Sequence, residues 1–73
     1  MLIMTTKLSV YVGERMKLFR QRLRLTQLVL AEKAGIDSNT YAKIERGDQT
    51  PSVETLEKIV KALGVKSSDV LPF

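Results

Sequence analysis

Apolar residues recur along the chain at the three- and four-residue spacing of helices, and no useful stretch alternates with the two-residue period of a strand. The first such stripe predicts a helix over residues 10–23, with Ser9 as its N-cap. Lys17, Arg20 and Arg24 fall together beside the stripe and give this helix a basic edge. Its expected core residues share one face: Val12, Met16, Phe19 and Leu23.

Three further helices are indicated by a capping residue before each apolar stripe and a glycine after it. With their N-caps and closing glycines, they are 27–34 (Thr26, Gly35), 38–46 (Asp37, Gly47) and 53–63 (Ser52, Gly64). The last of these has an expected apolar face of Val53, Leu56, Ile59, Val60 and Leu63. A final turn is expected over 67–71. The sequence thus predicts an all-α bundle of four to five short helices over residues 10–73, preceded by an N-terminal extension, residues 1–9.

The second and third predicted helices have the residue types that a helix-turn-helix requires. Ala31 is small where the backbone of the next helix must approach, Gly35 supplies the turn, and Ile36 fills the space beneath it. Tyr41 and Ile44 fix the third helix to the core. In this geometry the third helix projects outward, as required for a helix that enters the major groove of DNA.

Three segments carry a family resemblance: LTQLVLAEKAGI (25–36), TYAKIERGDQTPS (40–52) and LEKIVKALGV (56–65). With them, residues 12–71 resemble the phage Cro and repressor type of helix-turn-helix domain, also called the xenobiotic-response-element family. The resemblance implies a lambda-repressor-like fold and sequence-specific binding of double-stranded DNA. The chain departs from the family pattern at Leu18, Leu28 and Val29, where polar residues are usual, and at Arg24, where glycine is frequent.

The outer side of the predicted third helix has the chemistry to read base edges. A helical wheel turns Tyr41 and Ile44 inward and leaves polar or small residues outside. Asparagine can bond adenine, lysine can reach guanine acceptors, and alanine can lie against a thymine methyl group. The candidate base contacts are Ser38, Asn39, Ala42 and Lys43. The alternative is a polar helix face that only contacts water.

Other residues are candidates for contacts with the DNA backbone, which position a protein without specifying sequence. They are Lys17, Gln27, Arg46, Gln49 and Thr50. The resemblance assigns Gln27, at the start of its helix, to a phosphate, and the alternative is that it and Thr26 only cap the helix. The resemblance also implies a structural ion pair between Arg20 and Glu45, with two independent surface charges as the alternative.

Composition and charge narrow the function classes. The 73 residues include no Cys and no His, which removes disulfides, thiolate nucleophiles, imidazole bases and the usual metal ligands. We therefore expect no enzyme activity, cofactor or metal. Residues 1–35 carry seven bases and two acids, a charge distribution that favours a polyanionic partner. The longest apolar runs have four residues, so we expect no membrane association and a cytoplasmic location.

These observations predict a transcriptional regulator, repressor-like, that binds a palindromic operator as a homodimer, formed either in solution or only on DNA. One helix of nine residues reads few base pairs, so useful selectivity requires two copies. The expected dimer interface is the apolar C-terminal segment Leu71, Pro72 and Phe73. The alternative is an antitoxin or adaptor that binds a protein partner through Leu18, Leu28 and Val29, with DNA binding secondary.

Overall fold

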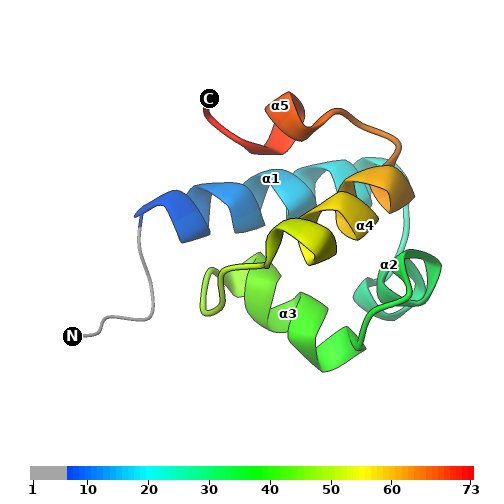
Figure 1. Ribbon diagram of the computed structural model, residues 1–73. Coiled ribbons are helices and arrows are strands. Elements are labelled where there is room, and N and C mark those ends of the chain that lie inside the picture. Colours follow the sequence, from blue (N-terminus) through cyan, green and yellow to red (C-terminus); the bar gives the residue numbers. More distant parts are fainter. Residues whose placement is uncertain (1–6) are drawn as a thin grey trace.

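The computed structural model describes residues 7–73, which form five helices and no strand (Figure 1). α1 lies between α3 on one side and the short α5 on the other, and α2 packs against both α3 and α4 (Figure 1). The prediction of an all-α bundle is confirmed. The helices are α1 (Lys7–Arg22), α2 (Gln27–Ala34), α3 (Ser38–Arg46), α4 (Val53–Leu63) and α5 (Ser67–Val70).

The predicted caps account for the ends of α2, α3 and α4. The side-chain oxygens of Thr26, Asp37 and Ser52 each accept a hydrogen bond from the backbone N–H of the third helical residue. After each helix a glycine adopts positive φ, between 71° and 81°, and its N–H bonds to carbonyls of the last turn. The predicted bounds of these three helices are therefore confirmed.

The core contains at least one fully buried side chain from every helix. Burying a large apolar side chain contributes about 1.5–3 kcal/mol, so this cluster holds the helices together. The largest buried side chains are Met16 in α1, Leu30 in α2, Tyr41 and Ile44 in α3, Ile59 in α4 and Val70 in α5.

Predictions about the ends of α1 were wrong at three positions. Ser9 is not an N-cap: it lies inside α1, is buried, and its hydroxyl is hydrogen bonded to Thr50 Oγ1 at 2.9 Å. Leu23 lies beyond the end of α1 and is 45% exposed, outside the core. Arg24 is not on the basic edge of α1, because it follows the helix with a left-handed φ of 60°.

Two further features differ from the prediction, one boundary and one buried face. Residues 7–9, assigned to the N-terminal extension, belong to α1, and residues 1–6 of that extension lie outside the described residues. Val53 is 83% exposed rather than part of the buried face of α4. It is the first residue of α4, and a helical side chain leans back toward the N-terminus, so Val53 extends beyond the packed surface.

α1 and α3 come close together at Gly13. A Cβ at this position would lie 2.4 Å from the carbonyl oxygen of Glu45 and 2.6 Å from that of Ile44. Both contacts are with backbone, which has no rotamer to move aside. Gly13 therefore sets the distance at which α3 lies against α1.

Candidate nucleic-acid interface

The turn between α2 and α3 has the predicted helix-turn-helix geometry. Gly35 ends α2 in the left-handed region with φ 74°, and the N–H of Ile36 bonds back to the carbonyl of Ala31 at 3.0 Å. Ala31 is buried and Ile36 packs against the core, while Asp37 begins α3. The turn thus directs α3 across α2, with Tyr41 and Ile44 buried beneath it.

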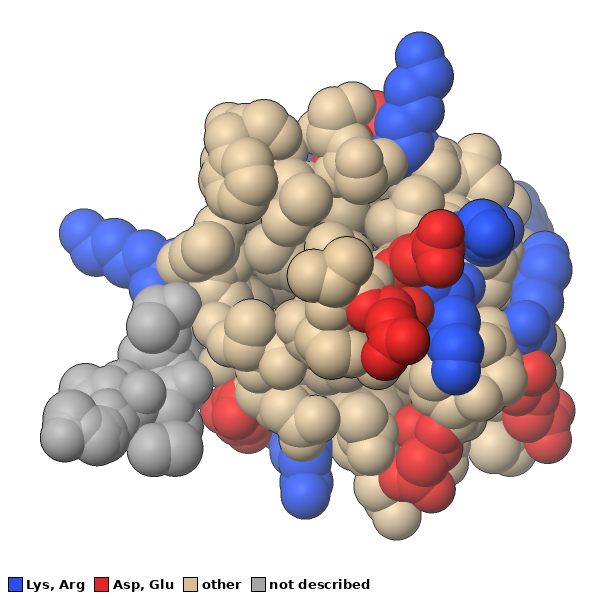
Figure 2. Space-filling model, in the orientation of Figure 1, with Lys and Arg blue, Asp and Glu red and all other residues tan. Residues whose placement is uncertain are grey.

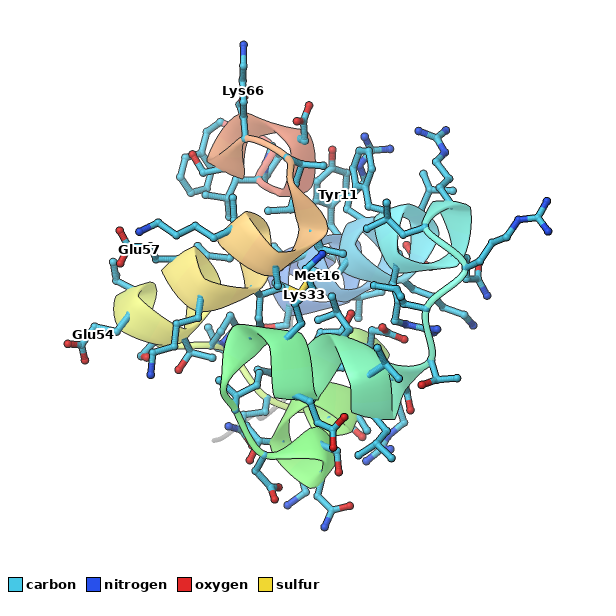
Figure 3. All side chains as sticks on the ribbon, turned by 90° about the vertical axis from the view of Figure 1, so that its right-hand side faces the viewer. Tyr11, Met16, Lys33, Glu54, Glu57 and Lys66 are labelled. Carbon is cyan, nitrogen blue, oxygen red and sulfur yellow. The ribbon has the colours of Figure 1, made fainter. Side chains whose placement is uncertain are left out.

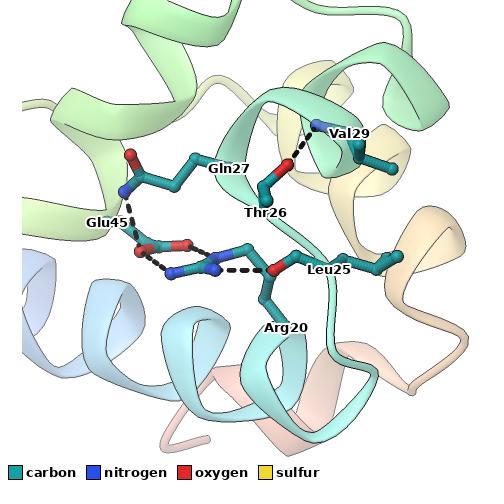
Figure 4. A network of polar contacts seen from close by, with 6 residues as sticks. All are labelled: Arg20, Leu25, Thr26, Gln27, Val29 and Glu45. Atoms are coloured by element: carbon teal, nitrogen blue, oxygen red, sulfur yellow. Dashed lines mark hydrogen bonds and ion pairs between the residues drawn. The ribbon is translucent and has the colours of Figure 1, made fainter.

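A buried ion pair joins α3 to α1, as the resemblance implied. Arg20 Nε donates to Glu45 Oε2 at 2.6 Å, and Nη2 donates to Oε1 at 3.0 Å (Figure 4). The side chains of Arg20 and Glu45 are only 11% and 3% exposed. The remaining terminal nitrogen of Arg20 donates to the carbonyl of Leu25 at 2.7 Å. One guanidinium therefore holds α1, the turn before α2, and α3 together.

The surroundings of this pair keep both members charged. Burial raises the pKa of Glu45, but hydrogen bonds donated to its charged form by Arg20 and Gln27 outweigh that effect, and the pKa falls below its usual value. The bonds to Glu45 raise the pKa of Arg20 further above its ordinary value. Burial also raises the pKa of Tyr41, whose hydroxyl has no hydrogen-bond partner within residues 7–73.

The predicted reading residues begin at the first residue of α3 and differ in their exposure. Asn39 and Lys43, one helical turn apart, are exposed, and Ser38 and Ala42 are half-buried. Neither Asn39 nor Lys43 makes a side-chain hydrogen bond or ion pair within the described part of the chain. Their amide and ammonium groups therefore remain accessible to a ligand.

Three of the predicted phosphate contacts surround one depression of about 400 Å³. Its lining comes from α1, the start of α2 and the end of α3, and includes Lys17, Gln27 and Arg46. Gln27 Nε2 donates to Glu45 Oε1 at 3.0 Å, so part of its side chain belongs to the ion-pair network (Figure 4). Arg46 Nε donates to Asp48 Oδ2 at 3.0 Å in an exposed pair.

The other two phosphate candidates follow α3 in the loop that leads to α4. Gln49 and Thr50 are both exposed, and neither lines the depression. The Thr50 hydroxyl is bonded to Ser9, which ties this loop to α1.

The predicted C-terminal interface has one anchored residue and two exposed ones. Leu71 is half-buried and packs against the core, whereas Pro72 is exposed and Phe73 is 82% exposed. Two mainly apolar depressions adjoin this region and share Leu56: one lies between α4 and Ser67, and the other includes Leu71. In the view of Figure 2 much of the upper left surface, around the C-terminal end, is uncharged.

The three residues suggested for a protein partner do not share one environment. Leu28 and Val29 are 55% and 43% exposed on α2, whereas Leu18 is half-buried on α1. Binding of a protein partner stays a prediction.

Sequence reasoning missed several residues that shape this region. Gly13 could have been found as a glycine inside a helical stretch, where it costs about 1 kcal/mol relative to alanine unless packing requires it. Glu14 lines the depression and Asp48 pairs with Arg46, but exposed acids carry no comparable sequence signal. The carbonyl of Leu25 is a backbone atom, and its bond to Arg20 depends on the folded turn.

A profile of the helix-turn-helix family matches residues 16–70. The chain belongs to the Cro and repressor type of helix-turn-helix proteins. The match covers the segments that carried the resemblance and includes α2, the turn and α3. This helix-turn-helix family consists of DNA-binding transcription regulators rather than enzymes, so the prediction of a DNA-binding regulator is confirmed at that level.

Individual relatives support the assignment. The chain is 43% identical over 60 residues to the immunity repressor protein of Bacillus phage phi105, covering 82% of this chain but only 42% of the repressor. It is 32% identical over 71 residues to control protein C.BamHI of Bacillus amyloliquefaciens, covering 96% of this chain and 88% of that protein.

Solved structures of helix-turn-helix proteins have the same fold. The restriction-modification controller protein C.AhdI from Aeromonas hydrophila superposes with a TM-score of 0.83 at 27% identity, over 86% of this chain and 96% of that one. The clp gene regulator ClgR from Corynebacterium glutamicum superposes with a TM-score of 0.82 at 29% identity, over 89% of this chain and 84% of that one.

No helix within residues 7–73 has the length and apolar character needed to span a membrane. Within the same range, no group of three or more acidic side chains could hold a metal ion.

Proposed function

We propose that the chain regulates transcription as a repressor-like protein that binds a palindromic DNA operator as a dimer. α3 enters the major groove, where Ser38, Asn39, Ala42 and Lys43 contact base edges. The observation that carries this proposal is the accessible outer side of α3, whose inner side is anchored by Glu45 and the core. A rigid helix with unpartnered polar groups on its outer face is suited to reading a fixed surface.

The depression beside α3 supports a phosphate site next to the groove. Lys17, Gln27 and Arg46 line it, and the backbone N–H groups at the start of α2 add the positive end of a helix dipole. Gln49 and Thr50, in the following loop, are further candidates for backbone contacts. These contacts fix the register of α3, while the base contacts supply sequence preference.

The dimer is proposed to form through the C-terminal segment. Phe73 and Val53 are more than 80% exposed, and the neighbouring depressions expose parts of Leu56, Val60 and Leu71. Covering this apolar surface with a second copy would remove it from water. Two copies related by a twofold axis would place their α3 helices about 34 Å apart, one turn of DNA.

Selection of bound sites from random duplex DNA tests the proposal. The expected product is a palindromic sequence, and affinity for it should fall steeply with salt, with a log–log slope of several units per dimer. A set of selected duplexes with no common sequence would contradict base readout. A salt-independent affinity would contradict the phosphate contacts.

The dimer interface is tested separately with a chain that lacks residues 72–73. Titration of full and half operators should show a reduced preference for the full palindrome, because the exposed apolar side chain of Phe73 has been removed. Half-site affinity should be unchanged, since neither residue lies on α3. An unchanged preference for the full palindrome would contradict this interface.

A second candidate function, binding of a protein partner, is favoured by the exposed Leu28 and Val29 on α2. One relative, 39% identical over 62 residues, is the multiprotein-bridging factor 1 of Debaryomyces hansenii, and the match covers 85% of this chain but only 41% of that protein. As an antitoxin or adaptor, the chain would bind its partner in a defined stoichiometry, and Leu28→Glu would abolish that complex. Stoichiometric association that survives Leu28→Glu and Val29→Glu would contradict this surface.

A further inference from the structure

The depression proposed to receive a phosphate is much less positive than its number of bases suggests. Three bases line it, Lys17, Arg20 and Arg46, but so do the carboxylates of Glu14 and Glu45. The net charge of the lining is therefore only +1. A phosphate entering this depression meets a weaker attraction than three bases alone would supply.

Most of these charges already have partners. Arg20 and Glu45 neutralise each other through two hydrogen bonds. Arg46 is paired with Asp48 at 3.0 Å, outside the lining. Lys17 is thus the one base of the lining without an ion-pair partner among the described residues.

Glu14 differs from the other carboxylate of the depression. It is exposed, and within residues 7–73 it makes no hydrogen bond or ion pair. It stands three residues before Lys17 on α1, so both side chains reach toward neighbouring parts of the surface. Its negative charge therefore acts on whatever enters the depression, rather than stabilising a contact inside the protein.

We propose that the negative charge of Glu14 lowers the affinity of the phosphate depression for any DNA duplex. The attraction of phosphates is independent of sequence and supplies nearly all of non-specific binding. With Glu14 present, the depression binds backbone weakly, and stable binding depends on the base contacts of α3. This inference rests on the proposed function, since it concerns the same phosphate site.

The test compares two variants that change net charge equally. Glu14→Gln removes the carboxylate from the depression, and Glu54→Gln removes one at the start of α4, which does not line it. Glu54 is exposed on α4, near Glu57 (Figure 3). Both variants and the parent are titrated with a 20-base-pair duplex of random sequence at several salt concentrations, and thermal melting confirms that all three fold.

Glu14→Gln is expected to bind the random duplex about three- to tenfold more tightly than the parent, the effect of one charge close to a phosphate at a protein surface. Its log–log salt slope should increase by about one unit for each protein copy bound. Glu54→Gln should change affinity by less than about twofold because it acts only through net charge.

Two results would overturn the inference in different ways. If the parent binds duplex DNA, and Glu14→Gln and Glu54→Gln bind it equally, Glu14 does not lower the affinity, while the proposed function stands. If neither the parent nor Glu14→Gln binds any duplex, the proposed function fails and the inference fails with it.

Discussion

The two sides of α3 differ in how completely the rest of the protein uses them. On the inner side Tyr41, Ile44 and Glu45 are at most 6% exposed and pack or bond to α1 and the core. On the outer side Asn39 and Lys43 are exposed and make no side-chain hydrogen bond or ion pair within residues 7–73. The inner side sets where the helix lies, and the outer side is left for a ligand. Stability and recognition should therefore respond to different substitutions.

Arg20→Ala should have the largest effect on the inner side. It leaves Glu45 charged and buried, which costs about 3–5 kcal/mol of folding free energy. For a domain of this size, that loss lowers the melting temperature by more than about 12 °C. Calorimetry measures the shift, and DNA affinity should fall with it because α3 loses its anchor.

Arg46→Ala is the matched control, since it breaks an ion pair whose side chains are 58% and 52% exposed. Its stability cost should be about 0–1 kcal/mol. Equal melting shifts in the two variants would contradict a special role for the buried pair.

The decrease in stability at acidic pH tests the Arg20–Glu45 pair without removing Arg20. Because the folded pKa of Glu45 lies below its ordinary value of about 4.5, the pair contributes stability above that pH. This contribution is lost as pH falls below 4.5 and through the folded pKa. Chemical unfolding from pH 6 to pH 2 should therefore show a shallower acid loss in Glu45→Gln than in the parent. Parallel curves would show that Glu45 does not contribute.

Gly13→Ala should destabilise the α1–α3 contact by about 3 kcal/mol, near the upper end for overpacking, because its Cβ would meet two backbone carbonyls. This loss should exceed the gain in helix propensity of about 1 kcal/mol. The control is Gly35→Ala, whose Cβ meets nothing within 4 Å and which pays only for a left-handed backbone, about 1–2 kcal/mol. A Gly13→Ala variant that melts above Gly35→Ala would be inconsistent with this packing.

Substitutions on the outer side of α3 should weaken DNA binding without lowering stability. Asn39→Ala and Lys43→Ala should each weaken binding to the selected operator by about 1–3 kcal/mol. Their melting temperatures should stay within about 4 °C of the parent, because exposed substitutions change stability by only about 0.5 kcal/mol. Melting temperature and operator affinity are measured for each variant. A fall in both would contradict the division between a stabilising inner side and a reading outer side of α3.

The smallest expected effect concerns the turn between α1 and α2. Arg24 is the one residue other than glycine with positive φ in the described part of the chain. Arg24→Gly should raise the free energy of unfolding by about 0.5–1 kcal/mol because glycine adopts this conformation without steric cost. Arg24→Ala removes the same charge but keeps the strained backbone, so it should give no such gain in a denaturant titration.

The parts of the fold that follow local rules were predictable from sequence. Thr26, Asp37 and Ser52 cap helices through bonds to residues three positions away, so each signal lies within a few residues. The ends of α1 were not predictable in the same way. Ser9 has the chemistry of an N-cap, but its hydroxyl bonds to Thr50, 41 residues away.

In the candidate site too, recurring patterns were predictable from sequence, and contacts between distant segments were not. The reading residues were named from the periodicity of α3 and Arg20–Glu45 from the family resemblance, because each follows a recurring pattern. The depression depends on how three helices meet, so the presence of Glu14 beside Lys17, Gln27 and Arg46 appears only in three dimensions. Likewise, a glycine inside a helical stretch can signal close packing, but the carbonyls of Ile44 and Glu45 that require Gly13 are known only once α3 is placed against α1.

The most direct test of the central claim is to compare the sites selected from random duplex DNA by the parent and by Lys43→Ala. If the outer side of α3 reads bases, the variant should lose preference at one position in each half-site and keep the parent's spacing between half-sites, with an unchanged melting temperature. If both proteins select the same sequence with the same preference at every position, Lys43 does not read bases, and the assignment of this face as the reading surface is contradicted.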